Sequence, residues 1–422
     1  MSDASGARTV DWRRLLVVYW LTSLIEGMGT SQIFALLPIS LREVGVPEAD
    51  RLAFVGLFTA LIFIVGAPFV PLWGVWADKY SRKAVIVRSA VVEAVVFACA
   101  ALSREPWQLA GSLLLIGLQL GNTGVMLAGL REVTPQRRIG TMVALFGASG
   151  PIGFAAGPAL AGILVDGAGW SVPAVYALSS GLSVATALLV TFGSPEIRPA
   201  IIPAGRVLRL AFGAVQGVLV DPTVRRIFLI FGVGMLANQM ARPYVPLLVE
   251  AIVGIGPGLA SSIALVTGAA ALAGALVSPL IGTLGDRVGF RPVLVGCLGA
   301  GCVALALMPV APVVPLLAAV ALVFAAAWSG VSAMVFGLLA TEVAEERRSA
   351  TLNLVYLPLY AAGVVGPATG SVVASTVGLS GPFIAGAAVL AAGALTIAFR
   401  GAGAGRRRHD RDGEASPPDD RV

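Results

Sequence analysis

Apolar stretches long enough to cross a membrane recur along this chain, and they restrict its fold more than any other feature. Of its 422 residues, 57% are hydrophobic and 12% are charged, whereas about 25% are charged in a typical soluble domain. A membrane-spanning helix needs about 20 apolar residues. Twelve stretches approach this length, at 15–38, 53–76, 84–102, 107–130, 141–165, 171–193, 227–249, 258–281, 292–310, 313–337, 349–374 and 381–399. Alternation typical of outer-membrane barrel strands is missing, so we expect an all-α integral membrane protein.

Several short patterns occur twice, about 208 residues apart. The string GVWADKYSRK begins at Gly74, and GTLGDRVGFR begins at Gly282. Gly157-Pro158 recurs as Gly366-Pro367, and Glu-Val-x-x-x-Arg-Arg occupies 132–138 and 342–348. Paired halves are common among transporters. We therefore expect two pseudo-symmetric six-helix bundles, over residues 1–194 and 227–400.

Two polar segments flank the second bundle. Residues 195–226 contain four prolines and five arginines, and we expect a cytoplasmic linker with a short amphipathic piece over 206–219 on the membrane surface. Residues 401–422 are too polar to pack and are expected to form a disordered cytoplasmic tail.

The distribution of Lys and Arg predicts the orientation. With both termini inside, 25 of the 29 cations fall in the N-terminus, the even-numbered loops or the tail, and Arg88 is counted among them. Arg42, Arg51 and Arg104 fall outside, and Arg242 is taken as the one cation within a span. This asymmetry is typical of a protein in the cell inner (plasma) membrane with cytoplasmic termini. The net charge of +6 then reflects orientation rather than nucleic-acid binding.

The chain has few residues that suit metal or catalytic chemistry. Cys99, Cys297 and Cys302 all fall within spans, and His409 lies in the tail. No cluster of nucleophiles, acids or ligands gathers at one membrane face. We therefore expect no disulfide, no metal, no cofactor and no enzymatic activity.

The repeated loop carries a glycine, an acid and several cations at fixed spacing. In the first copy these are Gly74, Asp78, Lys79, Arg82 and Lys83, and in the second Gly282, Asp286, Arg287 and Arg291. Glycine permits close helix approach, and Asp78 can accept hydrogen bonds at a helix start. The cations can pair with carboxylates of the opposite half, which would hold the inner side shut in one state. The alternative is that they only set topology, but the duplication favours a gate.

This loop resembles the signature loop of the major facilitator superfamily, G-x-x-x-D-[RK]-x-G-R-[RK]. Ser81 stands in place of the second glycine, and Phe290 stands where an arginine is common. The resemblance implies twelve helices around a central cavity lined by helices 1, 4, 7 and 10, with the two halves rocking about the substrate. It also implies that Asp78 meets the start of helix 11, where Ser349 and Thr351 are plausible donors.

Predicted helix 5 carries a glycine ladder. Gly147, Gly150, Gly153 and Gly157 recur every three or four residues, and Pro158 and Gly162 follow. Glycines at this spacing share one helix face and form a smooth groove. The stretch resembles the motif of drug:proton antiporters, with ordinary helix packing as the alternative. The arginine common midway along helix 4 in that family has no counterpart between Trp107 and Leu130, so proton coupling cannot be transferred from it.

Ionisable groups at membrane depth are functional candidates, because they are costly to bury unpaired. Glu26 lies near the midplane between Thr22 and Thr30, and we interpret it as the proton-carrying residue. A structural glutamate bonded to neighbouring hydroxyls is the alternative. Glu93, on predicted helix 3, more readily suits pairing with a neighbouring helix than a transport role.

Arg242 follows Asn238 and Gln239 and precedes two helix-interrupting prolines. It could bind an anionic substrate group, pair with an acid such as Glu26, or extend to the outer interface. Amide, aromatic and hydroxyl side chains on several spans would complete a substrate cavity. The expected cavity residues are Thr30, Gln119, Asn122, Gln239, Arg242, Trp328, Asn353 and Tyr356.

The sequence thus predicts a monomeric transporter in the lipid bilayer that exports drugs or hydrophobic metabolites in exchange for protons. An uptake transporter or a uniporter for one metabolite is the first alternative, and a polytopic enzyme or scaffold is the second.

Overall fold

The computed structural model describes residues 11–199, 202, 204–343, 354 and 357–414, and over these residues it contains helices and no strands. The first part of the chain forms α1 (Trp12–Glu43), α2 (Glu48–Ile64), α3 (Gly66–Lys79), α4 (Arg82–Leu102), α5 (Pro106–Ile116), α6 (Asn122–Val133), α7 (Ile139–Gly162) and α8 (Val172–Gly193). The second part forms α9 (Val207–Val220), α10 (Pro222–Ala241), α11 (Val245–Val253), α12 (Leu259–Val288), α13 (Phe290–Leu307), α14 (Val314–Glu342), α16 (Leu357–Val377) and α17 (Gly381–Glu414). Short 3-10 or π turns occupy Gln136–Arg138, Ile163–Gly167, Arg242–Tyr244 and Met308–Val310.

Ten helical stretches in the described part of the chain are long and apolar enough to cross a membrane. The other two predicted spans are interrupted helices. The span 107–130 divides into α5 and α6, and Gly121 at the start of α6 has φ +97°, a left-handed conformation that glycine adopts without steric cost. The span 227–249 divides into α10 and α11 at Pro243 and Pro246, which lack the N–H groups that a continuous helix needs.

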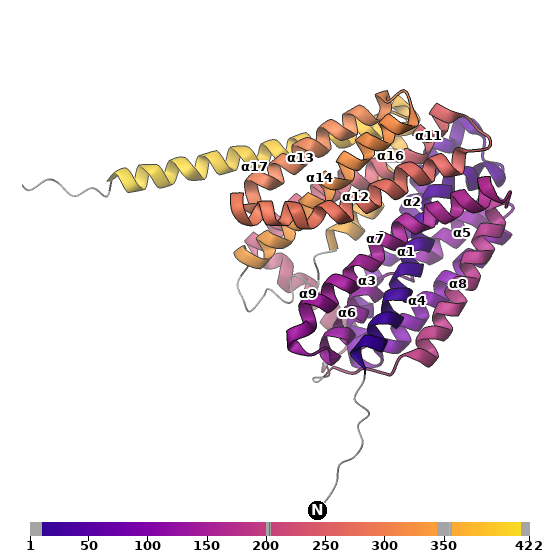
Figure 1. Ribbon diagram of the computed structural model, residues 1–422. Coiled ribbons are helices and arrows are strands. Elements are labelled where there is room, and N and C mark those ends of the chain that lie inside the picture. The colour runs from indigo at the N-terminus through magenta and orange to yellow at the C-terminus, as the bar shows by residue number, and fades with distance from the viewer. Residues whose placement is uncertain (1–10, 200–201, 203, 344–353, 355–356, 415–422) are drawn as a thin grey trace, which may run out of the picture.

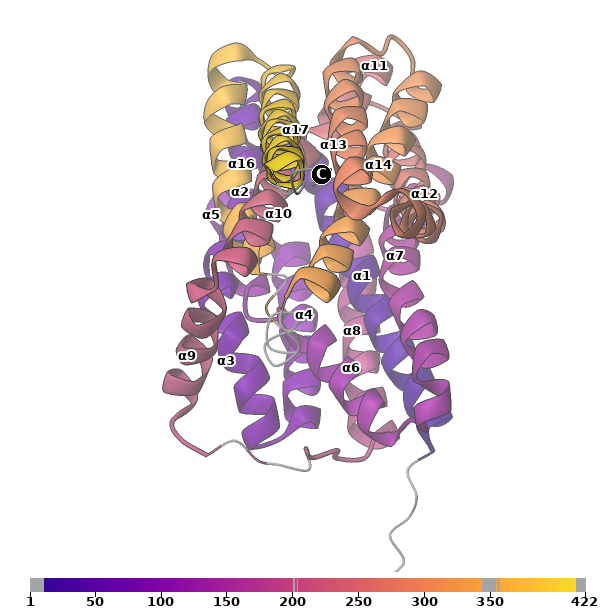
Figure 2. The same cartoon turned by 90° about the vertical axis from the view of Figure 1, so that its left-hand side faces the viewer.

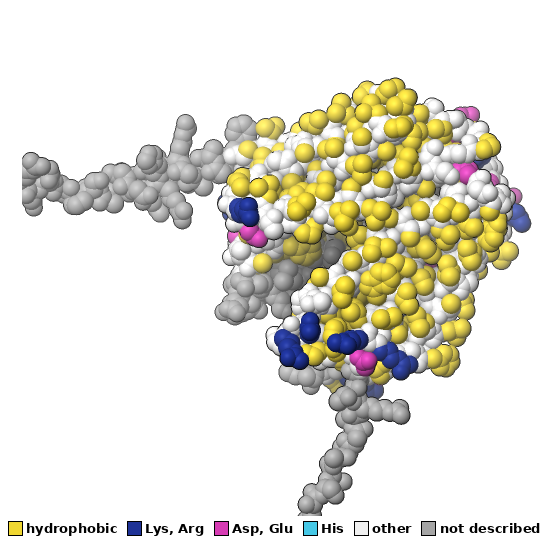
Figure 3. All heavy atoms as spheres, in the orientation of Figure 1, with side chains coloured by type: hydrophobic (Ala, Val, Ile, Leu, Met, Phe, Trp, Pro, Cys, Tyr) yellow, Lys and Arg dark blue, Asp and Glu magenta, His cyan; other side chains and the backbone are white. Residues whose placement is uncertain are grey.

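The helices form two bundles, α1 to α8 and α10 to α17, and the bundles contact each other mainly through α2 with α16 and through α7 with α12. In Figure 1 the bundles converge on the right, where α2 and α11 lie, and diverge toward the left. We call the end that contains the α1–α2 connection (residues 44–47) the closed end. The opposite end, with Trp12 and both repeated loops, is the open end. Figure 3 shows the surface hollowed between the two bundles.

At the closed end the bundles are joined by polar contacts, of which the central ion pair is buried. Arg51 of α2 forms an ion pair of 2.7 Å with Glu250 of α11, and these residues are only 7% and 9% exposed. Arg42 lies 3.8 Å from the same carboxylate. The Tyr244 hydroxyl donates to the Leu52 carbonyl, and the Ser261 N–H donates to Asp166. Among the described residues, the hydrogen bonds and ion pairs that join α1–α8 to α10–α17 lie at this end.

The outer surface of both bundles is apolar, as a lipid-facing surface requires. Large side chains such as Phe192, Leu276 and Leu280 are mostly exposed. Figure 3 shows hydrophobic side chains over the visible faces of both bundles, with charged side chains confined to the edges of the molecule. The all-α membrane architecture expected from the apolar stretches is therefore present.

Two segments outside the bundles are also helical. The amphipathic piece expected over 206–219 corresponds to α9, which packs against α3 and α10. The last helix, α17, continues to Glu414, whereas the sequence predicts disorder from residue 401. Once a helix is nucleated, each added residue gains a backbone hydrogen bond without needing a tertiary contact, which accounts for the extension.

Candidate functional site

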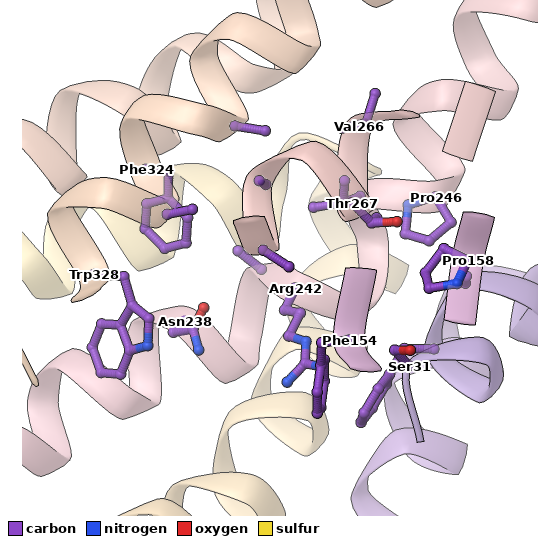
Figure 4. A pocket seen from close by; sticks show the side chains of 18 of the residues that line it. Ser31, Phe154, Pro158, Asn238, Arg242, Pro246, Val266, Thr267, Phe324 and Trp328 are labelled. Carbon is purple, nitrogen blue, oxygen red and sulfur yellow. The ribbon is translucent and has the colours of Figure 1, made fainter. Parts of the chain in front are cut away.

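A cavity of about 250 Å³ lies between the two bundles. It is lined by Ser31, Phe34, Ala35, Phe154, Pro158, Asn238, Ala241, Arg242, Val245, Pro246, Val266, Thr267, Ala270, Ala271, Leu305, Met308, Ala321, Phe324, Ala325 and Trp328. The lining comes from α1 and α7 of the first bundle and from helices of the second (Figure 4). A site with both bundles in its wall changes shape whenever they move relative to each other.

Arg242 lies at the break between α10 and α11 and extends into this cavity (Figure 4). Its guanidinium carbon lies 4.2 Å from the ring centre of Phe34 and 5.1 Å from that of Phe154. Both rings belong to the first bundle, so the cation crosses the interface between bundles. The sequence leaves three roles open for Arg242. This placement agrees with contact to a substrate in the cavity rather than with extension to the outer membrane interface or pairing with Glu26.

The opposite wall is aromatic. Trp328 of α14 stacks on Phe231 of α10, with ring centroids 6.0 Å apart and an interplanar angle of 4°. Phe324 lies one turn before Trp328, and Asn238 lies between this wall and Arg242 (Figure 4). The cavity thus combines flat apolar surfaces with a few polar groups, as small-molecule sites do.

The other expected cavity residues are located elsewhere. Gln119 and Asn122 are buried inside the first bundle, and Gln239 packs against Gly366 of α16. Thr30 belongs to α1 but is not part of this lining. For Gln119 and Asn122 the reason is that the break between α5 and α6 interrupts the helix on which they were expected to share a face. Asn353 and Tyr356 lie outside the described residues.

Glu26 is 7% exposed and lies inside the first bundle. The Asn122 amide nitrogen, at the first residue of α6, lies 2.5 and 2.6 Å from the two carboxylate oxygens. The Thr22 hydroxyl donates instead to the Val18 carbonyl of its own helix. The expected polar stripe on helix 1 is therefore completed by a side chain from another helix, which only the tertiary fold reveals.

Arg88 is a site residue that the sequence interpretation missed, because it was counted with the loop cations. It lies inside α4, with its guanidinium carbon 3.7 Å from the centre of the Trp73 ring. It donates to the carbonyls of Gln119 and Leu120, at 3.2 and 3.1 Å. Those carbonyls are freed by the break between α5 and α6, and a helix end leaves such groups without partners. The Arg88 guanidinium, which belongs to α4, thus reaches the middle of the predicted span 107–130. Its position within the predicted span 84–102 could have identified it as a cation at membrane depth.

Glu93 also faces this region. Its side chain is 1% exposed and lies against Gly29 of α1, one turn beyond Glu26. Neither carboxylate oxygen meets the geometric criteria of a hydrogen bond with a described residue, but Ser183, Gln119 and Glu26 all lie near it. Glu93 therefore lies against a neighbouring helix, the one that carries Glu26, but the structure shows no ion pair for it among the described residues.

The first repeated loop forms a network within its own bundle. Arg82 contacts Asp78 through two nitrogens, at 2.8 and 2.7 Å, and its third nitrogen lies 2.9 Å from Glu132. The Glu196 carboxylate accepts from the Arg82 N–H at 2.9 Å and from the Ser81 hydroxyl at 2.5 Å. Lys79 donates to the Gly205 carbonyl. Asp78 therefore contacts Arg82 here, and the predicted donors Ser349 and Thr351 lie outside the described residues.

The second repeated loop forms a parallel pair. Arg291 lies 2.8 Å from Glu342, and the pair corresponds to Arg82 and Glu132 in the first bundle. In each bundle, therefore, the repeated loop forms an ion pair with the repeated Glu-Val-x-x-x-Arg-Arg segment. Phe290 occupies the position of Arg82 and packs against Gly337 instead, and the cation comes one residue later. Asp286 and Arg287 are exposed at the end of α12.

The two repeated loop glycines are not helix contacts in this conformation. A Cβ atom added at Gly74 or Gly282 would meet no described atom within 4 Å. The close approach that the sequence suggests is absent because the bundles diverge at the open end.

The sequence model of the Major Facilitator Superfamily matches residues 19–267 and 227–419. The chain belongs to the major facilitator superfamily. Members of this superfamily are membrane transporters of small molecules, so the chain is a transporter and not an enzyme.

Named relatives agree with this membership. The chain is 27% identical over 291 residues to the multidrug resistance protein MdtG of Citrobacter koseri, with 68% of this chain and 70% of the relative covered. It is 25% identical to MdtG of Yersinia enterocolitica, with 70% of each covered.

Solved structures share the superfamily fold. The nucleoside transporter NupG matches with a TM-score of 0.75 at 16% identity, covering 91% of this chain and 98% of NupG. A bacterial homolog of the human lysosomal transporter Spinster, in an inward-facing and occupied conformation, matches with a TM-score of 0.75 at 14% identity, covering 94% and 97%.

The glycine motif of this superfamily member joins α7 to two other helices. A Cβ at Gly153 would overlap the Leu24 carbonyl of α1, and one at Gly157 would overlap the Met28 carbonyl and the Ser31 hydroxyl. A Cβ at Gly162 would lie 2.9 Å from Ser261 of α12, in the other bundle. Pro158 lines the cavity. Gly147 and Gly150 contact nothing at their Cβ positions, so the tight groove involves only part of the ladder.

Proposed function

We propose that this transporter exports drugs or hydrophobic small metabolites in exchange for protons, by alternating access. The observation that carries this proposal is the position of Glu26. It is a buried carboxylate on α1, the helix that also supplies Ser31 and Phe34 to the cavity. A change in its protonation changes the charge inside the first bundle, and α1 would transmit that change to the substrate site.

The form of the cavity supports a hydrophobic substrate. Phe34, Phe154, Phe324 and Trp328 offer flat apolar surfaces, and such surfaces accept ligands of varied shape because their attraction is not directional. The relatives named multidrug resistance proteins support export of several compounds.

The orientation proposed here places both termini and the open end in the cytoplasm, with the protein acting as a monomer in the cell inner membrane. The cations of the repeated loops and of the chain start lie at that end, as the positive-inside rule requires. The loop residues around Asp78 and Asp286 would then close the cytoplasmic side once the bundles rock. Arg82 and Arg291 would exchange their present partners during that step.

Replacement of Glu26 by Gln tests the proton step. The variant Glu26→Gln keeps the size of the side chain and removes its titration, so proton-driven efflux from proteoliposomes should be abolished while expression is retained. Efflux of a fluorescent compound chosen from a resistance panel, under an imposed pH gradient, measures this. Glu43→Gln, an exposed position at the end of the same helix, is the matched control and should transport normally.

Three results would change the proposal. Efflux by Glu26→Gln with unchanged pH dependence would remove Glu26 from the mechanism. Loss of efflux in both Glu26→Gln and Glu93→Gln would assign the proton to the pair. Substrate counterflow by the unmodified protein that ignores the pH gradient would favour a uniporter or uptake transporter.

A further inference from the structure

The cavity between the bundles contains a single charged side chain among its described lining residues, and that side chain is Arg242. The acids on nearby helices lie outside this lining, and Glu93 is buried against Gly29 of α1. Glu26 is bound by Asn122, Glu250 by Arg51, and Asp166 by the Ser261 N–H. No ion pair joins Arg242 to a described residue. The cavity therefore has a net positive charge at the interface between the two bundles.

Burial of a cation at membrane depth is costly unless a partner compensates it. The rings of Phe34 and Phe154 compensate part of this cost, since a cation over an aromatic face gains about 0.5–2 kcal/mol. An arginine also has five N–H donors in a planar fork suited to a carboxylate. Phe34 and Phe154 have no acceptor oxygens in their side chains, so the rings leave these donors free for an anionic group.

The rest of the cavity indicates what the anion would be attached to. Across from Arg242 lie Phe324 and Trp328, and Asn238 lies between them and the cation (Figure 4). A flat apolar body can stack on the indole while a group at its end reaches the guanidinium. A cationic ligand would instead meet Arg242 with no acid in the described lining to offset the repulsion.

We propose that this cavity binds amphiphilic organic anions, in which one carboxylate is attached to an aromatic or aliphatic body, and that Arg242 is the partner of the carboxylate. This inference rests on the proposed transport function and specifies its substrate class. Phe34 and Phe154 act as positioning residues that hold the guanidinium at the interface between the bundles.

Equilibrium binding to the purified full chain in detergent tests the substrate class. Three probes share one skeleton and differ in charge, namely 2-naphthoate, 2-naphthamide and 2-naphthylmethylammonium. A charged hydrogen bond contributes about 1.5–3 kcal/mol, so calorimetric titration should show the naphthoate binding about ten- to a hundredfold more tightly than the other two. Equal affinities, tighter binding of the ammonium, or no measurable naphthoate binding would overturn the proposal.

Variants then assign the preference to Arg242. Arg242→Gln should remove the preference for naphthoate over naphthamide, while Arg242→Lys should retain it in weakened form. Arg13→Gln removes an exposed cation of α1 outside the cavity and should leave all three affinities unchanged. A preference that survives in Arg242→Gln would overturn the assignment. If Arg242→Gln does not fold, the probe series on the unmodified protein still decides the class.

The binding test involves no gradient, so its outcome is independent of the proton-driven efflux assay. Gradient-driven efflux without naphthoate preference would refute the substrate class alone. Naphthoate binding without gradient-driven efflux would refute the proposed proton coupling alone.

Discussion

At the scale of single residues, Asn122 determines the surroundings of Glu26. The break at Gly117–Gly121 makes Asn122 the first residue of α6, and its amide lies within hydrogen-bonding distance of both carboxylate oxygens. A continuous helix would have turned this side chain to a different direction. The break is stabilised in turn by Arg88, which binds the freed carbonyls of Gln119 and Leu120. Three helices therefore contribute to one buried carboxylate.

Asn122→Ala should destabilise the protein by about 1–3 kcal/mol, because it leaves a buried acceptor without its donor. In a double-mutant cycle with Glu26→Gln, the two changes should be coupled by about 0.5–3 kcal/mol. Thermal unfolding in detergent measures both values. Thr123→Ala, the next residue and exposed, is the control and should have little effect. Strictly additive effects of Asn122→Ala and Glu26→Gln would contradict the assigned contact.

At the scale of elements, the packing of α1 against α7 depends on glycines, which have no side chain to separate the two helices. Gly153 and Gly157 bring the α7 backbone against the carbonyls of Leu24 and Met28. Gly27 of α1 faces Gly150 and Gly153 in return, and a Cβ there would lie 3.0 Å from the Gly150 carbonyl. Since backbone atoms cannot rotate away as side chains do, this contact fixes the position of α1, and with it both Glu26 and Phe34.

Gly157→Ala should lower the free energy of unfolding by about 1–3 kcal/mol, since overpacking forces backbone shifts. Gly150→Ala lies on the same helix at a position where the added methyl group meets nothing within 4 Å. There the better helix propensity of alanine should leave stability unchanged or raise it by up to about 1 kcal/mol. Thermal unfolding of both variants in detergent compares them, and equal losses would refute the close approach.

The sequence predicts the helices better than it predicts which side chains of different helices contact each other. Apolar length predicts the spans, and the repeat predicts that Asp78 and Asp286 occupy corresponding loops. The spacing cannot reveal that Arg82 contacts Glu132, because those residues are joined only when α3, α4 and α6 pack. Similarly, Gln119 and Asn122 share a face only on an unbroken helix, and Gly117 and Gly121 did not identify the break because glycine is frequent in membrane helices. Arg88 was missed because it was counted with the loop cations, although it lies within the predicted span 84–102.

At the scale of the whole molecule, the two ends differ in what holds the bundles. At the closed end, Arg51 and Glu250 join α2 to α11 across the interface. At the open end, the pairs Arg82–Glu132 and Arg291–Glu342 lie within single bundles. Such an arrangement stabilises one conformation by contacts that the opposite conformation must give up.

Glu250→Gln should shift the protein away from the closed-end conformation. Breaking one partner of a buried ion pair costs about 3–5 kcal/mol, enough to change a two-state ratio more than tenfold. Spin labels at Asp50 and Val253, exposed on α2 and α11, should show a new population at longer distance by pulsed dipolar spectroscopy. Arg104→Gln changes an exposed cation of the α4–α5 loop and should leave the distribution unchanged. An unaltered distribution in Glu250→Gln would show that the pair does not hold this end.

The division of α1 between two environments has a kinetic consequence. Glu26 faces the interior of the first bundle, whereas Phe34, about 12 Å farther along the same helix, faces the cavity. On the proposed function, a proton on Glu26 and a transported molecule would therefore occupy separate sites and would not displace each other. Acidification should alter the maximal velocity more than the apparent affinity for the cargo.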